Sequence, residues 1–453
     1  GPVAACGVGL FSDGYINSVI GSVKTILSAQ YGKEWKGSDA KHWIGNITFL
    51  GTVVGMLLFG YTSDKWSRTN TLMASTVVII VFTILVTATF AGDDHITMFN
   101  MLVAFRFFVG IGVGGEYPAG SVAAAEGTKG LKAGTRNMWI SLVTNAAIDW
   151  GFVIGALVPY ILAVVTTNYD IMWRVSLGLG VLLPCYLLFL RSKLKEPEEY
   201  TKHSMRHAKV PYGLVFRYYG VRLFAVASIW FLYDFVSYSF DIFSSAILAN
   251  LYDDNAPLTT VFGWNTVINF MYIPGAMLGA PLADRIGGRW TMIWGLGIQA
   301  ILGYILAGTY ASLAKPALVG LFSILFGIFL SLGELGPGNC TFILGSQLSA
   351  TGVRGQFLGV AAAVGKLGAF LGTYIFPYVV ALGGDSDVLS AQYPFYVASS
   401  LSLVACGIAY FLIPEMTQDQ IALEDERFRA FLEENNYDTR QLGLKKGETV
   451  EGK

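Results

Sequence analysis

The sequence predicts an all-α membrane protein in which twelve spanning helices form two similar six-helix halves. Three observations predict this fold class: an apolar composition, twelve long apolar stretches and an internal repeat. Of the 453 residues, 54% are apolar and 13% are charged, whereas soluble domains carry roughly 25% charged residues. A mean hydropathy of +0.54 means more apolar surface than one soluble core can bury, so we expect a lipid bilayer around the chain. The net charge of −1 lacks the basic excess of nucleic-acid-binding proteins, and we expect no nucleic-acid partner.

Twelve stretches are long enough to cross a bilayer, which takes about 20 apolar residues in a helix. They cover residues 3–28, 41–62, 70–91, 98–125, 135–165, 171–191, 219–250, 260–283, 290–311, 316–347, 355–382 and 391–413. A polar segment separates the first six from the last six. The sequence therefore predicts an N-terminal half at 1–191, a linker at 192–217, a C-terminal half at 218–413 and a tail at 414–453.

Basic residues are unevenly distributed among the connecting segments. With both termini inside, the inner loops contain Lys65, Arg68, Lys129, Lys132, Arg136, Arg285, Arg289 and Arg354. The outer loops then contain Asp93, Asp94, Asp253, Asp254, Asp385 and Asp387, and the exception is the first outer loop, with Lys33, Lys36 and Lys41. Because lysine and arginine favour the cytoplasmic side, we expect both termini in the cytoplasm.

The two halves share a repeat at nearly constant spacing. The matched elements are Asp64-Lys65 with Asp284-Arg285 at an offset of 220, and Gly115-Glu116 with Gly333-Glu334 and Arg136 with Arg354, both at 218. Three motifs in one register indicate two related halves rather than a chance similarity.

The loop from Gly60 to Arg68 resembles the G-x-x-x-D-K/R-x-x-R signature of the major facilitator superfamily, whose members consist of two parallel six-helix halves. The second copy has Ala280 where the pattern has glycine. This resemblance implies a twelve-helix transporter with alternating access. It also implies a gating role for four charged residues: Asp64, Arg68, Asp284 and Arg289.

Further motifs resemble those of phosphate:proton symporters and, in the first span, of their fungal glycerophosphodiester permease branch. They are the fourth-span run ending in Gly115-Glu116-Tyr117-Pro118, the seventh-span Trp230-x-x-x-Asp234-x-x-x-Tyr238, the eleventh-span Gly365-Lys366-x-Gly368-Ala369, and the first-span Asp13-Gly14-Tyr15-Ile16-Asn17. The resemblance implies a phosphate-ester site made by Lys366, Tyr117, Trp230, Asp234, Tyr238, Asn145, Asp149 and Asn339. Lys366 is the expected phosphate anchor, with Asn145 and Asp149 on the head-group side.

Two departures touch the expected phosphate site. Ile148 replaces the family's fifth-span glutamine, and Asp149 follows it. In the tenth span the family's Gly-Pro-Asn-Thr becomes Gly336-Pro337-Gly338-Asn339, which displaces the asparagine by one residue. Both changes favour a larger or less charged ester over inorganic phosphate.

Ionisable side chains within spans are costly and mark substrate or ion pathways. The candidates are Asp13, Arg106, Glu116, Asp149, Asp234, Asp241, Glu334 and Lys366. Asp13 and Glu116 are the expected proton-coupling residues, tuned by Arg106, which could instead hold a backbone carbonyl. Lys366 could be a structural ion-pair partner of Asp234 or Glu334, and Asp149 a partner of a basic residue.

The sequence thus predicts a proton-coupled symporter for a glycerophosphodiester at a fungal plasma membrane, acting as a monomer without a cofactor. Inorganic phosphate, and then a sugar or another organic anion, are the alternative substrates. A membrane enzyme would need a histidine or metal cluster that the four histidines and four cysteines do not form. A nutrient receptor that signals without transport is the remaining alternative.

Overall fold

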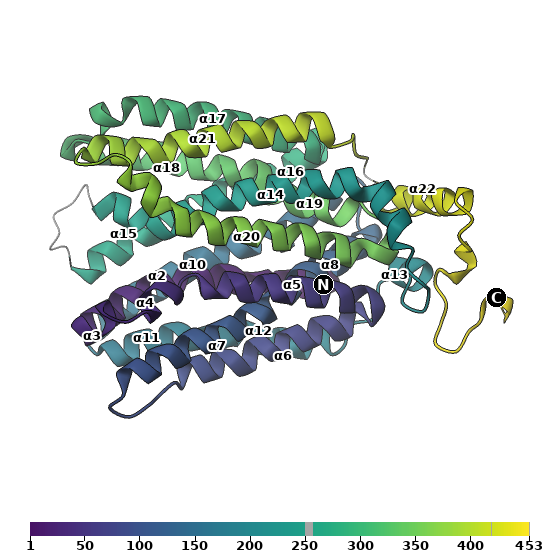
Figure 1. Cartoon of the computed structure of the whole chain (residues 1–453), viewed down its shortest axis with the longest axis horizontal. Coiled ribbons are helices and arrows are strands. Elements are labelled where there is room, and N and C mark those ends of the chain that lie inside the picture. The colour runs from purple at the N-terminus through teal and green to yellow at the C-terminus, as the bar shows by residue number, and fades with distance from the viewer. Residues whose placement is uncertain (250–256, 418, 453) are drawn as a thin grey trace.

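The computed structural model describes residues 1–249, 257–417 and 419–452. Within these ranges the chain is helical and contains no strand, and twelve helical segments are long and apolar enough to span a membrane. Asp253 and Asp254, two of the acidic residues expected in outer loops, lie outside the described residues. The helices run side by side, with the N-terminal half below and the C-terminal half above in Figure 1.

Several spans consist of more than one helix. The N-terminal half contains α1 (Pro2–Gly7), α2 (Phe11–Tyr31), α5 (Ile47–Lys65), α6 (Arg68–Thr87), α7 (His95–Gly115), α8 (Val122–Gly127), α9 (Arg136–Val143), α10 (Asn145–Val165), α11 (Tyr169–Gly178) and α12 (Leu182–Arg191). The C-terminal half contains α14 (Tyr212–Ala249), α15 (Leu258–Phe270), α16 (Tyr272–Ile286), α17 (Gly288–Leu313), α18 (Val319–Gly333), α19 (Asn339–Gln347), α20 (Arg354–Ala381) and α21 (Asp387–Leu412). Short helices outside the spans are α3 (Lys33–Lys36), α4 (Ala40–Trp43), α13 (Glu198–His203) and α22 (Gln420–Glu434).

Apolar side chains cover much of the outer surface of the spans. Leu382 is 75% exposed, Phe216 72% and Phe411 80%. Such exposure is unfavourable in water but suits lipid tails, so the chain is a multi-pass membrane protein.

The repeated glycine–glutamate motif has the same local structure in both halves. A π-helical turn begins at Glu116 and ends at Ser121, between α7 and α8, and another runs from Glu334 to Gly338, between α18 and α19. Single π-helical turns occur often at functional sites, because they redirect side chains within a continuous helix. Each turn contributes one side chain that meets the other half: Tyr117, through Asp13, approaches Tyr238 and Lys366, and Glu334 accepts from Asn145.

The two ends of the bundle differ. We call the end that carries α13 and α22 the tail face and the end that carries α3 and α4 the loop face; they lie at the right and the left of Figure 1. At the tail face the halves hold each other reciprocally. Asp64 accepts hydrogen bonds from the backbone N–H groups of Gly355 (2.9 Å) and Gln356 (2.7 Å) at the start of α20.

The symmetric contact is made by Asp284 of the C-terminal half, which accepts from the N–H groups of Asn137 and Met138 at 3.0 Å each, at the start of α9. A carboxylate at a helix N-terminus satisfies otherwise unpaired donors and is favoured by the helix dipole. The halves are thus tied together at the tail face.

Arg68 strengthens this closure, whereas Arg289 does not. Arg68 pairs with Asp64 and with Glu126 (2.9 Å), and Glu126 also binds Arg354 of the other half at 2.9 Å. Arg289 instead contacts Glu415 (2.7 Å) and the carbonyl of Tyr410, both on its own side. Arg68 follows its aspartate by four residues, one helical turn, while Arg289 follows Asp284 by five and points elsewhere. Among the described residues, Arg289 makes no hydrogen bond or ion pair with the N-terminal half, so this structure gives no support to its expected gating role.

The predicted linker and tail contain more helix than expected. Helix α13 forms within 192–217, α14 already begins at Tyr212, and α22 forms in the tail. Glu424 on α22 accepts from Tyr219 (3.0 Å) and pairs with Arg222 (2.7 Å), while Phe428 and Leu432 are buried. The tail therefore packs onto the tail face.

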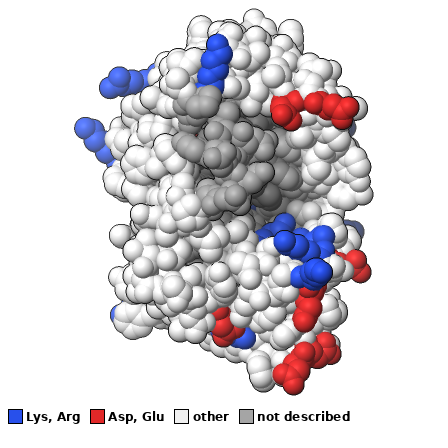
Figure 2. All heavy atoms as spheres, turned by 90° about the vertical axis from the view of Figure 1, so that its left-hand side faces the viewer, with Lys and Arg blue, Asp and Glu red and all other residues white. Residues whose placement is uncertain are grey.

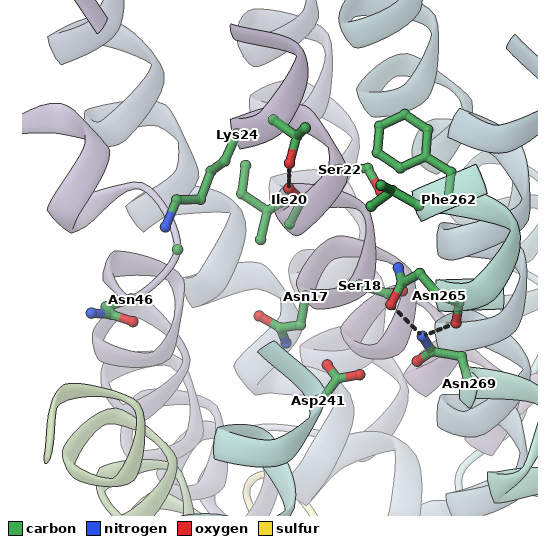
Figure 3. Close-up of a pocket in the computed structure, with 14 residues that line it drawn as sticks. Asn17, Ser18, Ile20, Ser22, Lys24, Asn46, Asp241, Phe262, Asn265 and Asn269 are labelled. Atoms are coloured by element: carbon green, nitrogen blue, oxygen red, sulfur yellow. Dashed lines mark hydrogen bonds between the residues drawn. The ribbon is translucent and has the colours of Figure 1, made fainter. Parts of the chain in front are cut away.

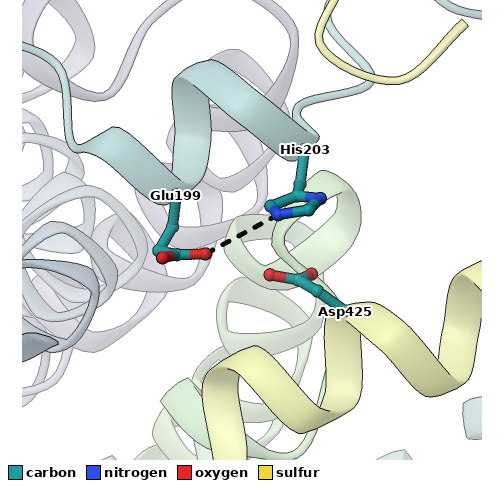
Figure 4. A group of neighbouring side chains, drawn as sticks. All are labelled: Glu199, His203 and Asp425. Atoms are coloured by element: carbon teal, nitrogen blue, oxygen red, sulfur yellow. Dashed lines mark ion pairs between the residues drawn. The ribbon is translucent and has the colours of Figure 1, made fainter.

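A group of three side chains joins α13 to α22: Glu199, His203 and Asp425 (Figure 4). The two carboxylates already hold other donors. Lys129 pairs with Glu199, and both oxygens of Asp425 accept hydrogen bonds of 2.7 Å from Thr351. This group therefore acts as a contact between linker, tail and C-terminal half. Burial, with smaller charge effects, raises the pKa of the neighbouring Tyr200 phenol to about 12, so it stays neutral.

Candidate substrate-binding site

Four buried side chains from both halves meet at the centre of the molecule. Asp13 on α2 and Tyr117 in the first π-helical turn come from the N-terminal half, and Tyr238 on α14 and Lys366 on α20 from the other. One oxygen of Asp13, Oδ2, accepts from the Tyr117 hydroxyl at 2.7 Å, the Tyr238 hydroxyl at 2.9 Å and the Lys366 ammonium at 3.1 Å. The ammonium also donates to Tyr238. Asp13 and Lys366 therefore form an ion pair across the two halves.

Close helix packing makes this meeting possible. A Cβ atom at Gly14 would lie 1.9 Å from the carbonyl oxygen of Ile148, and one at Gly368 would lie 2.3 Å from that of Phe231. Both distances are far below contact, so α2 can approach α10, and α20 can approach α14, only with glycine at these positions. The two glycines lie within one turn of Asp13 and Lys366.

Aromatic rings surround the Lys366 ammonium. It lies 4.1 Å from the ring centre of Tyr238, 5.3 Å from that of Tyr117 and 5.7 Å from that of Phe49. Cation–π attraction compensates part of the loss of hydration. The partner of Lys366 is thus Asp13, and the expectation that it pairs with Asp234 or Glu334 is wrong for this conformation.

A second polar cluster joins the halves one layer away. Asn145 of α10 donates to Glu334 Oε2 (2.8 Å) and to Asn339 Oδ1 (2.9 Å), both in the C-terminal half. Tyr233 donates to the other oxygen of Glu334, and the Asn339 amide donates to the carbonyl of Ala276 at 3.0 Å.

Asp149 completes this cluster through its contact with Glu334, to which its carboxyl group lies within hydrogen-bonding reach. Asp149 is fully buried, and neither of its oxygens meets a donor from the described residues. The expected alternative of a lysine or arginine partner is therefore wrong: within the described chain its charged neighbours are Glu334 and Asp241.

A narrow cavity lies between the two clusters. It is lined by Tyr117, Asn145, Ile148, Asp149, Phe152, Trp230, Tyr233, Asp234, Ser237, Tyr238, Glu334, Gly338, Thr341 and Phe342. Three of these are carboxyl groups and none is a lysine or arginine among the residues that the structure describes. The lining is therefore acidic, with Asp149, Asp234 and Glu334 placed to face hydroxyl or cationic groups.

Most residues expected to bind substrate meet at this cavity. Tyr117, Trp230, Asp234, Tyr238, Asn145 and Asp149 line it. Lys366 lies behind Tyr238, and Asn339 is reached through Asn145. Glu334, named only as a buried charge from the sequence, and Tyr233 also line the cavity; the repeat of Gly115-Glu116 at Gly333-Glu334 was the available signal for Glu334.

The proton-coupling residues are arranged differently from the expectation. Glu116 forms a two-pronged ion pair with Arg191, at 2.6 and 2.7 Å, within the N-terminal half. Arg106 donates to the carbonyl oxygens of Ile44 (3.0 Å) and Ile16 (3.4 Å). The expected tuning of Asp13 or Glu116 by Arg106 is therefore wrong for this conformation, and the alternative that Arg106 holds a backbone carbonyl applies. Lys366 pairs with Asp13, and Arg191 pairs with Glu116.

Comparisons with known proteins agree with this architecture. The family model described as "Sugar (and other) transporter" matches residues 2–209 and 192–428. A glycerophosphocholine permease of Candida albicans is 42% identical over 447 residues, which are 98% of this chain and 84% of the relative. The major glycerophosphoinositol permease of the same organism is 42% identical over 450 residues, 98% of this chain and 83% of the relative.

Among solved structures, the proton:xylose symporter XylE bound to 6-bromo-6-deoxy-D-glucose superimposes with a TM-score of 0.77 at 18% identity, covering 94% of this chain and 97% of XylE. That likeness confirms the predicted major facilitator fold. The relatives confirm the resemblance to fungal glycerophosphodiester permeases, and they are transporters rather than enzymes. This chain belongs to the sugar (and other) transporter family.

Proposed function

We propose that this protein imports a glycerophosphodiester together with protons, by alternating access, across a fungal plasma membrane. The permease relatives support the substrate class. The excess of lysine and arginine in the loops at the tail face supports a cytoplasmic location for that face and for both termini. A single chain encloses the whole central cavity, which supports a monomer as the working unit.

The observation that carries the proposal is the ion pair between Asp13 and Lys366, which joins the halves at the central cavity. While Asp13 is ionised, it neutralises the cation that could bind a phosphodiester. A proton on Asp13 cancels its charge and releases the Lys366 ammonium toward the substrate. Proton binding and anion binding thereby become one coupled event, as symport requires.

Glu116 is a second proton-coupling residue in this proposal. Its pair with Arg191 lies on the tail-face side of the cluster, beside the backbone of Cys6. A proton on Glu116 would release Arg191 in the same way that a proton on Asp13 releases Lys366. The roles differ in place: Asp13 bridges the halves, whereas Glu116 acts within one half.

The head group then faces the three carboxyl groups of the cavity. A polyol can donate hydroxyl hydrogens to Asp149, Asp234 and Glu334, and a choline cation can face Trp230 and the carboxylates. Inorganic phosphate, the alternative substrate, carries between one and two charges at neutral pH, and a second charge would be repelled there. This acidic lining favours the singly charged diester.

Alternating access requires the tail face to open after proton and substrate have bound. The contacts that must break are the caps made by Asp64 and Asp284, the pair of Arg354 with Glu126, and the hydrogen bond from Arg68 to the carbonyl of Thr351. Their breakage would expose the cavity to the cytoplasmic side.

Uptake by proteoliposomes tests the proposal. We expect accumulation of glycerophosphocholine or glycerophosphoinositol driven by an inward proton gradient, with weak competition from phosphate at equal concentration. Accumulation of phosphate in preference to either diester would contradict the substrate assignment, and uptake indifferent to the gradient would contradict symport.

A further inference from the structure

A second polar pocket lies between the two halves on the loop-face side of the central cluster (Figure 3). It is lined by Asn17, Ser18, Ile20, Gly21, Ser22, Lys24, Thr25, Gly45, Asn46, Asp241, Val261, Phe262, Asn265 and Asn269. Seven of these fourteen residues carry amide or hydroxyl groups, and Asp241 is one of the ionisable residues that the sequence places within a span. We call this the outer pocket.

Three buried polar atoms of the outer pocket have no hydrogen-bond partner among the described residues: Asn17 Oδ1, Ser22 Oγ and Asn269 Oδ1. Their side chains are only 4%, 3% and 1% exposed. Leaving such atoms unpaired is costly, so the polar pocket around them indicates a polar occupant.

The chemistry of the unpaired atoms specifies what that occupant must offer. The Asn17 amide already donates to Asp13, and the Asn269 amide donates to the carbonyl and side-chain oxygens of Asn265. The atoms left over are two amide carbonyl oxygens, which need donors, and the Ser22 hydroxyl, which can donate or accept. Hydroxyl groups of glycerol or of a polyol supply such donors.

Lys24 provides a cation in the same pocket. Its side chain extends toward Gly45 and Asn46 (Figure 3), and it forms no ion pair or hydrogen bond with the described residues. Its charged neighbours include Arg106 and Lys41, both positive, and Asp241 lines the same pocket. In contrast to Lys366, which Asp13 neutralises, Lys24 can accept an anion without first losing a partner.

The surface outside this pocket also favours an anion. Figure 2 looks onto the loop face and shows a group of basic side chains on it, and an open hollow lies on the same face. The hollow is lined in part by Lys24, Lys36, Lys41 and His42. A basic rim around a cleft raises the local concentration of anions and their association rate.

We propose that the outer pocket is a separate binding site for the incoming glycerophosphodiester, occupied before the central cavity. Lys24 binds the phosphodiester anion, and Asn17, Ser22 and Asn269 accept hydrogen bonds from its hydroxyl groups. This inference rests on the proposed function. Asn17, which lines the outer pocket, also donates to Asp13 Oδ1 at 3.0 Å. A ligand in the outer pocket would therefore be connected through Asn17 to the Asp13–Lys366 pair.

The experiment compares Lys24→Gln, Lys24→Arg and the surface control Lys33→Gln in proteoliposome uptake of glycerophosphoinositol. We expect Lys24→Gln to raise KM about tenfold with a maximal rate within twofold of wild type. We expect Lys24→Arg to restore most of the affinity. Lys33→Gln, an exposed residue of the same face, should leave KM unchanged and thereby exclude general attraction by surface charge.

A binding measurement separates this inference from the function. Lys366→Ala should retain diester binding through the outer pocket, and the double variant Lys24→Gln/Lys366→Ala should lose it. An unchanged KM in Lys24→Gln, with wild-type transport intact, would overturn the outer site and leave the proposed function standing. A wild type that neither transports nor binds a diester would overturn both.

Discussion

The carboxyl groups of Asp149 and Glu334 lie against each other across the boundary between the two halves. Tyr233 and Asn145 donate to Glu334, while the described residues offer no donor to Asp149. Two ionised carboxylates would repel each other in this buried setting, so the arrangement favours a single proton shared between the two groups. The neighbouring ionisable groups, Asp234, Asp241 and Tyr272, include no cation that would replace it.

The shared proton predicts how stability depends on pH. As pH rises and the proton is lost, two buried negative charges face each other, so the wild-type unfolding temperature should be lower at an alkaline pH than at a neutral pH. In Glu334→Gln an amide hydrogen replaces the proton permanently, and this fall should be much smaller. Thermal unfolding in detergent measures both. The matched control is Glu116→Gln, which loses its Arg191 pair and should be destabilised at both pH values; an equal slope in all three proteins would contradict the shared proton.

Replacing Asp13 should uncouple transport from protons. Asp13→Asn removes the charge that neutralises Lys366, so diester exchange without a gradient should persist while gradient-driven accumulation is lost. Glu116→Gln should also reduce accumulation. The measurement is uptake and exchange in proteoliposomes with and without a pH gradient. Wild-type accumulation in both variants would remove Asp13 and Glu116 from the proton pathway.

Lys366 should be the phosphate anchor of the central cavity. A charge-assisted hydrogen bond contributes roughly 1.5–3 kcal/mol, so Lys366→Ala should weaken diester binding to that cavity at least tenfold. Because the outer pocket keeps Lys24, the loss is best measured in a Lys24→Gln background by calorimetric titration. Normal central binding combined with failed transport would instead assign Lys366 to gating.

Asp149 should influence the choice of head group. Asp149→Asn keeps the size of the side chain and can donate to Glu334, but it removes a carboxyl group that can face a choline cation. We expect the variant to lose preference for glycerophosphocholine over glycerophosphoinositol by several-fold. Uptake measured with the two diesters in competition gives the ratio of glycerophosphocholine to glycerophosphoinositol transported. An unchanged ratio would place the head group elsewhere in the cavity.

The reciprocal caps at the tail face should control opening. Asp284→Ala leaves two N–H groups at the start of α9 without their carboxylate, and loss of such a cap costs roughly 0.5–2 kcal/mol. Gln347 is buried near the tail face. We expect a cysteine introduced at this position to react faster with a thiol reagent in Asp284→Ala than in the otherwise wild-type protein. Arg289→Ala, whose contacts stay within one half, is the matched control and should label like wild type. Equal labelling in both would exclude Asp284 from gating.

The sequence by itself determined the fold class, the number of spans and the repeat. Hydropathy and helical length act within one segment, and they suffice to define each span because the bilayer sets the same requirement for all of them. The repeat also identified Asp64 and Asp284, whose reciprocal caps follow from its symmetry, and the two glutamates that each begin a π-helical turn. Family motifs carried by a few residues selected six of the fourteen residues that line the cavity.

Only the tertiary structure decided which charges meet. Asp13 and Lys366 are 353 positions apart, and Glu116 and Arg191 are 75 apart. Periodicity places a charge on a face of its helix, but the partner depends on how that face packs against helices of the same and the other half. That packing is set by close approaches such as those at Gly14 and Gly368, which no single segment specifies. For this reason Arg106 was expected beside a carboxylate and is held by backbone carbonyls, while Asp149 and Glu334, two acids that no local pattern would pair, lie together.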